Sequence, residues 1–265
     1  MDIQLNYNHS KMSDKLLKIF NEIESNHWWW LGRRKITGVF LDKINLQKEC
    51  KILDGGCGTG AELIFLQQYG EVYGVDLSPI AIKFCKERGL SKVKVADLSK
   101  LPFQDNFFDL VCLMDVIEHI KDSQIILKEI KRVLKPGGHV FLTVPALPFI
   151  FSLHDTQQGH FRRYRKSSLR EFFDKAGFKE KRLSYFNFLL SPPIIFIRLL
   201  SRISVIGNKI ANFDSRVNNN LNYSISKISP VNKFLYHCFA AESVLMKFTN
   251  LPLGVSIIAL YENEK

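Results

Sequence analysis

The sequence predicts an α/β protein built on a doubly wound, mostly parallel sheet with helices on both faces. Strand-like and helix-like segments alternate from residue 51 to residue 145, which is the pattern of parallel strands joined by crossover helices. Residues 109–114, Asp-Leu-Val-Cys-Leu-Met, are almost wholly apolar, as expected for a central strand buried on both faces. A glycine-rich loop follows the first predicted strand, and an acidic residue ends each of the first three strands.

The glycine-rich loop spans residues 55–60, Gly-Gly-Cys-Gly-Thr-Gly, directly after the predicted strand 51–54. Glycine tolerates positive φ and lets a ligand approach bare backbone. The helix expected to begin near Ala61 presents free N–H groups to such a ligand. The segment therefore predicts a binding loop for a nucleotide-type cofactor.

Three acidic residues indicate which cofactor this is. Asp76 with Gly56 and Gly58 also fits the dinucleotide pattern G-x-G-x-x-G/A, so a nicotinamide oxidoreductase is one alternative. Asp54 directly precedes the glycines, however, where a carboxylate suits a cationic amine and not a diphosphate. Asp76 suits ribose hydroxyls, and Asp97 suits an adenine amino group. An amino acid, a ribose and an adenine together describe S-adenosyl-L-methionine.

The ordered motifs over residues 50–145 resemble those of class I S-adenosylmethionine-dependent methyltransferases. They are Leu53-Asp-Gly-Gly-Cys-Gly-Thr-Gly60, Gly74-Val-Asp-Leu-Ser-Pro79, Ala96-Asp-Leu98, Leu101-Pro-Phe, Phe108-Asp-Leu-Val111 and Leu134-Lys-Pro-Gly-Gly138. The chain departs from the family at Gly55, where Val or Ile is common. The resemblance implies a Rossmann-like sheet of seven strands, with residues 178–185 and 253–261 as the sixth and seventh.

The resemblance also implies a cofactor pocket at the glycine loop and the strand ends, closed by N-terminal helices. We expect the following cofactor-binding residues: Trp30, Arg33, Arg34, Asp54, Gly56, Cys57, Gly58, Gly60, Asp76, Leu77, Asp97, Leu98, Met114 and Asp115. One of the two arginines is expected to pair with the methionine carboxylate, and the sequence leaves both open.

The expected domains are an N-terminal helical cap (1–48), a cofactor-binding core (49–185 and 253–265) and a helical insertion (186–252). The cap holds all three tryptophans of the chain, at positions 28–30. These residues form either a lid over the cofactor or a hydrophobic plug that packs the first helix onto the sheet.

The segment Asp115-x-x-Glu118-His119 resembles the Glu/Asp-x-x-Glu-His motif of ubiquinone-pathway O-methyltransferases. That motif has been linked to a divalent metal in the family, but many relatives carry it without one. We therefore expect no metal, and keep Asp115, Glu118 and His119 as weak candidate ligands. The main interpretation is a wall of the active site, with His119 also a candidate general base.

A second polar cluster lies in residues 154–164, and we interpret it as a wall of the acceptor site. Either His154 or His160 is a candidate base, and Asp155 would orient it. The expected substrate-binding residues are Asp155, Arg162 and Arg163, the arginines binding an anionic group. Tyr164 is a further catalytic candidate. The alternative is a hydrogen-bonded structural turn.

The insertion begins within a stretch of fifteen uncharged residues, 183–197, which is shorter than a membrane-spanning helix and holds two prolines. From Pro193 onward it predicts an amphipathic helix with Arg198 and Arg202 one turn apart. Such a helix suits a membrane interface, a pocket for an apolar substrate or a dimer surface, or plain packing on the domain.

Charge and cysteine content limit the partners and the compartment. The formal net charge of +11 arises in residues 159–250, so we expect an anionic partner: a membrane surface, an acidic acceptor or nucleic acid. Five cysteines without a C-x-x-C pair indicate reduced thiols. Residues 1–8 lack the apolar core of a signal peptide. We expect a cytoplasmic protein with peripheral contact to the inner membrane face.

The function expected from these features is transfer of a methyl group from S-adenosyl-L-methionine to the oxygen of a small or lipid-like acceptor with an anionic part. The alternatives are N- or C-methylation of a secondary metabolite, glycolipid or peptide, and a non-catalytic cofactor-binding partner. The sequence argues against a nucleic-acid methyltransferase, because no Asn/Asp-Pro-Pro-Tyr motif follows the fourth strand. The oligomeric state stays open.

Overall fold

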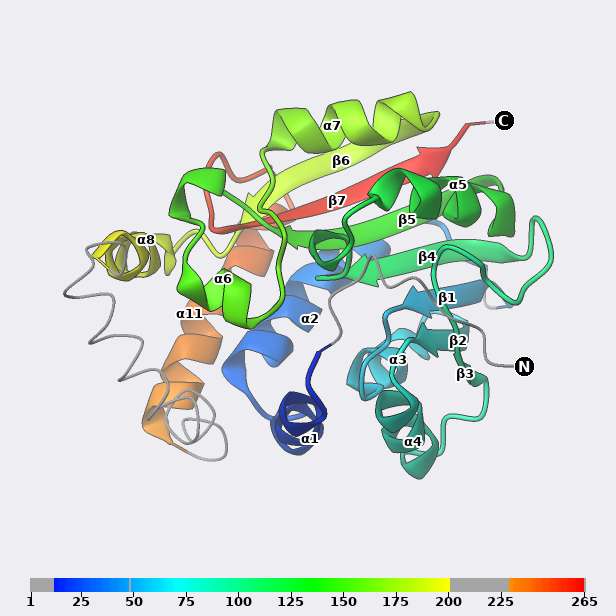
Figure 1. Ribbon diagram of the computed structural model, residues 1–265. Coiled ribbons are helices and arrows are strands. Elements are labelled where there is room, and N and C mark those ends of the chain that lie inside the picture. Colours follow the sequence, from blue (N-terminus) through cyan, green and yellow to red (C-terminus); the bar gives the residue numbers. More distant parts are fainter. Residues whose placement is uncertain (1–11, 48, 201–228, 265) are drawn as a thin grey trace.

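The computed structural model describes residues 12–47, 49–200 and 229–264, and a seven-stranded sheet lies at its centre (Figure 1). The strands are β1 (Lys51–Gly55), β2 (Glu71–Asp76), β3 (Val93–Val95), β4 (Phe108–Met114), β5 (Leu134–Pro145), β6 (Phe178–Phe186) and β7 (Ser256–Asn263). Their order is β3-β2-β1-β4-β5-β7-β6. The first five strands run parallel, and β7 pairs antiparallel with both β5 and β6. This confirms the predicted doubly wound, mostly parallel sheet.

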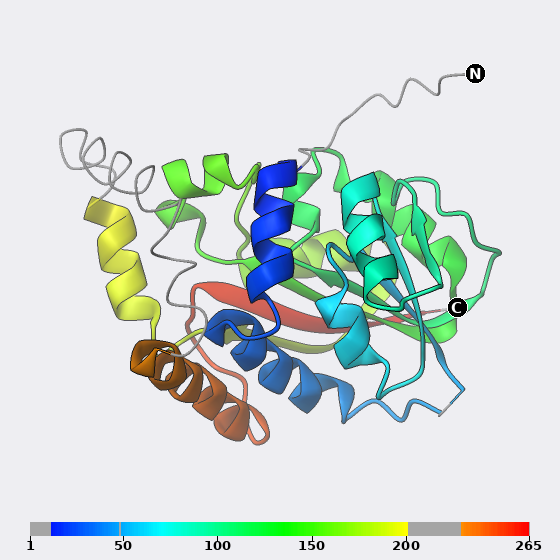
Figure 2. The same cartoon turned by 90° about the horizontal axis from the view of Figure 1, so that it is seen from below.

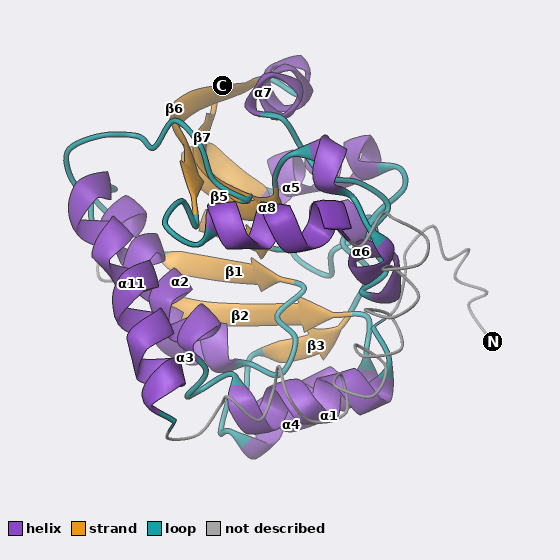
Figure 3. Ribbon diagram, turned by 90° about the vertical axis from the view of Figure 1, so that its left-hand side faces the viewer, coloured by secondary structure: helices purple, strands orange, loops and turns teal. Residues whose placement is uncertain are grey.

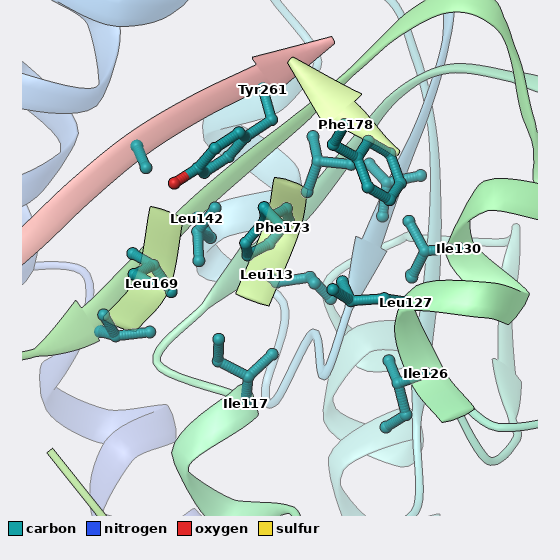
Figure 4. Packing of buried hydrophobic residues seen from close by; sticks show 14 of the residues in the cluster. Leu113, Ile117, Ile126, Leu127, Ile130, Leu142, Leu169, Phe173, Phe178 and Tyr261 are labelled. Atoms are coloured by element: carbon teal, nitrogen blue, oxygen red, sulfur yellow. The ribbon is translucent and has the colours of Figure 1, made fainter. Parts of the chain in front are cut away.

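Helices cover both faces of this sheet because its strands are apolar on both sides. On β1, the fully buried Ile52 packs in a cluster with the helices α2 (Trp28–Leu41), α3 (Ala61–Leu66), α4 (Pro79–Glu87) and α11 (Pro230–Met246). Its neighbour Leu53 faces the opposite cluster, which α5 (Ser123–Val133) and α7 (Lys166–Lys175) complete. Figure 4 shows this second cluster, in which the ring of Phe173 stacks on Tyr261 of β7 with centroids 4.1 Å apart.

The strand order reverses between β1 and β4, and this determines where a ligand can bind. In an open parallel sheet, the connections from two strands at such a reversal leave in opposite directions, which opens a crevice at their carboxyl ends. The glycine loop leaves β1 at this edge, and Asp115 leaves β4 there. The 3₁₀ helix η1 (Ile117–His119) follows β4 directly.

The N-terminal helices and the insertion pack against each other over one face. The helix α1 (Asp14–Ile23) precedes α2, and α11 lies along α2 (Figure 3). A Cβ atom on Gly32 of α2 would lie 2.4 Å from a ring carbon of Phe239, so only glycine permits this close approach. The Trp29 ring stacks on the same Phe239 with centroids 5.1 Å apart. The backbone N–H of Trp28 donates to the side-chain oxygen of Asn232 in α11 at 2.8 Å. Two of the three tryptophans therefore act as a packing plug.

The segments after β5 contain short helices that the sequence pattern did not predict. After β5 the chain forms the 3₁₀ helix η2 (Pro148–Ile150) and the short helix α6 (Leu153–Gln157). The insertion opens with α8 (Ser191–Leu200), while Arg202 lies outside the described residues. In the described part of the chain, no helix combines the length and the apolarity that crossing a membrane requires.

Candidate active site

The glycine loop is held tightly against β2 and is open on its other side. The backbone N–H groups of Gly56 and Cys57 both donate to the Val75 carbonyl, at 2.8 and 3.0 Å. Gly58 has a φ of +52°, and a Cβ atom built on it would meet no atom within 4 Å. This open backbone next to the N-terminus of α3 is the cradle that a cofactor of this kind needs.

Two of the predicted acids lie at adjacent strand ends and are oriented by backbone N–H groups. One oxygen of Asp76 accepts from the Gly58 N–H at 3.0 Å, and the other accepts from the Ser78 N–H at 2.8 Å. Asp97 accepts from the Ser99 N–H at 2.7 Å. Each carboxylate oxygen has a second lone pair, so hydroxyl or amino groups of a nucleoside can bind as well.

A buried group of charges surrounds Arg33 beside this loop. Arg33 donates to Glu62 at 3.0 Å and also pairs with Asp115, while Arg34 pairs with Glu62 at 3.2 Å. Asp54 is only 2% exposed, and burial raises its pKa well above the usual range. The structure thus places Arg33 between Glu62 at the start of α3 and Asp115 at the end of β4, and Arg34 at the edge of the group.

Unsatisfied atoms in this group fit a zwitterionic ligand. Arg33 Nε and the second Glu62 oxygen are buried without a hydrogen-bond partner among the described residues. Buried polar groups of native proteins are normally hydrogen-bonded, so these atoms are suited to the amine and carboxylate of an amino-acid moiety. Sequence reasoning missed Glu62; its position in the first turn of the helix after the loop was the available signal.

The N-terminal helices are tied to the glycine loop by a residue that sequence reasoning also missed. Glu24, at the end of α1, is buried and accepts a hydrogen bond from the Thr59 hydroxyl. Arg88, which follows α4, donates to the same Glu24 oxygen at 2.8 Å. Trp30 packs edge-on against Phe20 of α1, with centroids 5.1 Å apart. These contacts hold α1 and the start of α2 against the loop, and the lid role of Trp30 stays a prediction.

The end of β4 is strained and faces the charged group. Asp115 has a φ of +57°, a left-handed conformation that is uncommon for a residue with a side chain. Its carboxylate accepts from the Thr143 hydroxyl at 3.1 Å and pairs with Arg33. Met114, one residue earlier, is buried in the core with α2. Asp115 therefore faces the cofactor side of the crevice.

A different trio of side chains forms a compact cluster on the acceptor side. One ligand atom from each of Glu118, His119 and His160 lies within 4.8 Å of the others. Glu118 is fully buried, and neither of its oxygens has a hydrogen-bond partner among the described residues. Burial, followed by the charge of Asp115, raises the Glu118 pKa well above its usual range. His160 thus takes the place in the candidate set that the sequence assigned to Asp115.

Each histidine of this trio is oriented by a second group. His160 Nδ1 lies 3.1 Å from an Asp155 oxygen, and the His119 ring is hydrogen-bonded to the Gly159 backbone. Burial, and then the charge of His160, lowers the His119 pKa to about 4. A neutral imidazole with one nitrogen fixed in this way is typical of a metal ligand. At neutral pH it is a weak general base, because its pKa lies far below the operating range.

Asp155 connects the acceptor cluster to two arginines. This wholly buried carboxylate also accepts from Arg163 Nη2 at 2.7 Å and from Arg198 of α8 at 2.9 Å. Burial alone would raise the Asp155 pKa, but the hydrogen bonds from His160 and Arg163 and the charge of Arg198 hold it well below its usual range. Asp155 is therefore ionised and interacts with three basic side chains at once.

The remaining residues predicted for the acceptor site lie around this hub. Arg163 is buried and also donates to the Ala146 carbonyl at 3.0 Å. Its guanidinium therefore binds groups within the protein and does not face a substrate anion. Arg162, less buried, donates to the Lys121 carbonyl at 2.6 Å.

The Tyr164 hydroxyl donates to the Ile117 carbonyl at 3.3 Å, which braces η1. His154 lies on α6 outside the trio, and burial and the charge of Arg198 lower its pKa to about 4.

Comparison with known proteins identifies the family and fold of this chain. Residues 53–142 match the methyltransferase-domain family. The demethylmenaquinone methyltransferase of Staphylococcus aureus is 30% identical in an alignment 213 residues long that covers 68% of this chain and 85% of that protein. The phosphoethanolamine N-methyltransferase 1 of Zea mays is 35% identical in an alignment 119 residues long that covers 42% of this chain. The match spans only 24% of that longer protein.

Among solved structures, a chain of the complex that contains the Trm112 methyltransferase activator of Haloferax volcanii has a similar fold. The TM-score is 0.61 at 18% identity, and the alignment covers 95% of this chain and 96% of that one.

Proposed function

Because this chain belongs to the class I S-adenosylmethionine-dependent methyltransferases, we propose that it transfers the sulfonium methyl group of S-adenosyl-L-methionine to a hydroxyl oxygen. The acceptor is a small or lipid-like molecule with an anionic part. The carbon–sulfur bond breaks as the carbon–oxygen bond forms, which leaves S-adenosylhomocysteine and the methyl ether, and the hydroxyl proton leaves to a base or to water.

The cofactor half of this proposal rests on three features of the crevice. Gly58 leaves the loop backbone open, two backbone N–H groups fix the Asp76 carboxylate at the end of β2, and the buried charges around Arg33 suit an amino-acid moiety. Methyl transfer needs the sulfonium and the acceptor oxygen in line, and holding that geometry accounts for most of the catalysis expected here. The Glu24 contact closes α1 over the loop, which would help to exclude water.

The acceptor half rests on one observation: the buried, unpartnered Glu118 carboxylate beside two oriented imidazoles. We infer that Glu118, His119 and His160 hold a divalent cation, since a carboxylate with two histidines is a common donor set for such ions. A cation there would lower the pKa of an acceptor hydroxyl and fix its oxygen. Asp155 keeps the His160 ring in place, and Tyr164 keeps η1 in place.

An amine acceptor is the second candidate, and the same carboxylate favours it. An ionised Glu118 can accept hydrogen bonds from an ammonium group in place of a metal ion, and one relative of the chain is a phosphoethanolamine N-methyltransferase. Metal dependence separates the two candidates. An amine acceptor needs no cation at the trio, whereas a hydroxyl acceptor loses its activation when the cation is removed.

The test is transfer of a labelled methyl group to an acceptor panel, with and without a chelator. The panel holds a catechol with an acidic substituent, a demethylated quinol and phosphoethanolamine. The proposal predicts transfer to a hydroxyl acceptor that a chelator abolishes and an added divalent cation restores. Chelator-insensitive transfer to phosphoethanolamine would establish the amine alternative. Binding of S-adenosylhomocysteine without methyl transfer to any acceptor of the panel would favour a non-catalytic cofactor-binding protein.

A further inference from the structure

The helix α8 presents an unusual surface for a protein in water. Its outward-facing residues are all apolar, namely Pro192, Pro193, Phe196, Ile197 and Leu199. Phe196 is 62% exposed and Ile197 is 54% exposed. Figures 1 and 2 place α8 at the outer margin of the molecule. A surface helix ordinarily turns its charged residues to water and its apolar residues inward, and here the outward face has no charged residue.

The charge of α8 is directed inward, and this fixes the orientation of the helix. Arg198 donates to the Ser152 hydroxyl at 3.0 Å and to Asp155 at 2.9 Å. On the same side, Ile194 and Ile195 pack against the main core. Rotating α8 to bury its outer face would remove one partner from a buried ionised carboxylate, which is strongly unfavourable. The exposed apolar face is therefore a maintained feature of the fold.

Cations lie beside this face. The helix α8 contacts η2, where Phe149 is 49% exposed. Next to Phe149 is a surface depression lined by Leu147, Pro148, Arg165 and Lys166. A second copy of the chain would bring like charges together at this surface, whereas an anionic lipid surface offers both apolar depth and opposite charge.

We propose that the outer face of α8, with Phe149 and the neighbouring Arg165 and Lys166, docks on an anionic membrane surface. This rests on the proposed lipid-like acceptor and adds the place from which that acceptor is drawn. The inner face supports the link, because Arg198 and His160 share the Asp155 carboxylate. Arg198 of the docked helix is thus hydrogen-bonded to the same Asp155 carboxylate that orients His160.

The test is cosedimentation of the purified full chain with vesicles of phosphatidylcholine, with and without about 30% phosphatidylglycerol, whose charge gives the vesicles a negative surface potential. The wild type should bind the anionic vesicles, and less so as salt is raised. The matched pair is Ile197→Ser on α8 and Ile125→Ser on α5, since these side chains are 54% and 51% exposed. Binding should fall by about threefold in Ile197→Ser and about tenfold or more in Phe196→Ser/Ile197→Ser, and stay unchanged in Ile125→Ser.

Several outcomes would overturn the docking proposal. The proposal is refuted if the wild-type protein does not sediment with anionic vesicles. It is also refuted if Ile197→Ser and Ile125→Ser lose vesicle binding to the same extent. A dimer that the double variant dissociates, measured by light scattering, would assign the face to a second copy. Binding of S-adenosylhomocysteine is measured in parallel for every variant. Intact cofactor binding and methyl transfer without vesicle binding refute the docking alone, whereas vesicle binding without transfer refutes the proposed function alone.

Discussion

The two sides of the crevice are built in different ways. The cofactor side uses backbone and short-range contacts, such as the Asp76 carboxylate that accepts from Gly58 and Ser78. The acceptor side is assembled from distant segments, because Glu118 leaves β4, His160 follows α6 and Arg198 belongs to the insertion. The first arrangement depends on contacts within one loop and its neighbouring strand. The second depends on how several distant segments pack together.

The largest effect expected on the acceptor side is that of Glu118→Gln. The amide keeps the shape but removes the anionic ligand, so we expect divalent-cation affinity and methyl transfer to fall by about 100-fold or more, since even outer partners of a metal site contribute 10- to 100-fold. Cofactor affinity should stay unchanged. Calorimetric titration with Mg²⁺ or Zn²⁺ and with S-adenosylhomocysteine measures both.

The control for this variant is Glu171→Gln on the exposed surface of α7, where the glutamate pairs with Lys175. It should change neither affinity. If Glu118→Gln bound cations like the wild type, the cluster would not be a metal site. If it lost cofactor binding as well, the two sides would not be separable.

Asp155→Asn tests whether the acceptor side depends on the Asp155 carboxylate. The change removes the charge that orients His160 and leaves Arg163 and Arg198 without their shared anion. We expect cation affinity to fall by about 10- to 100-fold, with a smaller effect on cofactor affinity. Equal losses on both sides would show that Asp155 supports the whole fold and not the acceptor side alone.

Gly32→Ala tests the packing of the insertion on α2. The new Cβ would lie 2.4 Å from Phe239, so the helices must separate, and we expect a loss of about 1–3 kcal/mol in the free energy of unfolding. Gly38→Ala in the same helix is the matched control, because its Cβ would meet only the Tyr69 hydroxyl oxygen at 3.3 Å. Urea denaturation should find the control neutral or slightly stabilised; equal losses would reject the packing account.

The smallest effect is expected from Glu24→Gln at the lid. The glutamine can still accept from Thr59, but it loses the charge-assisted bond from Arg88, and such bonds are about twice as strong as neutral ones. We expect S-adenosylhomocysteine affinity to fall by no more than about fivefold in calorimetry, with cation affinity unchanged. A change in cation affinity alone would place Glu24 on the wrong side of the crevice.

This contrast also explains what the sequence could predict. The parallel sheet, the glycine loop and the place of Asp76 at a strand end followed from local patterns, because parallel strands put their carboxyl ends at one edge of the sheet. Local patterns could not choose between His154 and His160, since the choice depends on how α6 and the following loop fold back onto η1. They also missed Glu24 and Glu62, whose partners come from other elements. They gave Asp115 both as a cofactor-binding residue and as a weak metal candidate, and its pairing with Arg33 was not readable from the sequence.

The most direct test of the central claim is calorimetric binding of S-adenosylhomocysteine to the wild type and to Asp76→Ala, with a nicotinamide dinucleotide as the competing ligand. The account predicts that the wild type binds S-adenosylhomocysteine and not the dinucleotide. It also predicts that Asp76→Ala loses about 10- to 100-fold in affinity, which is the value of a hydrogen bond or two to a charged group. Binding of the dinucleotide in preference to S-adenosylhomocysteine would contradict the assignment of the crevice and everything built on it.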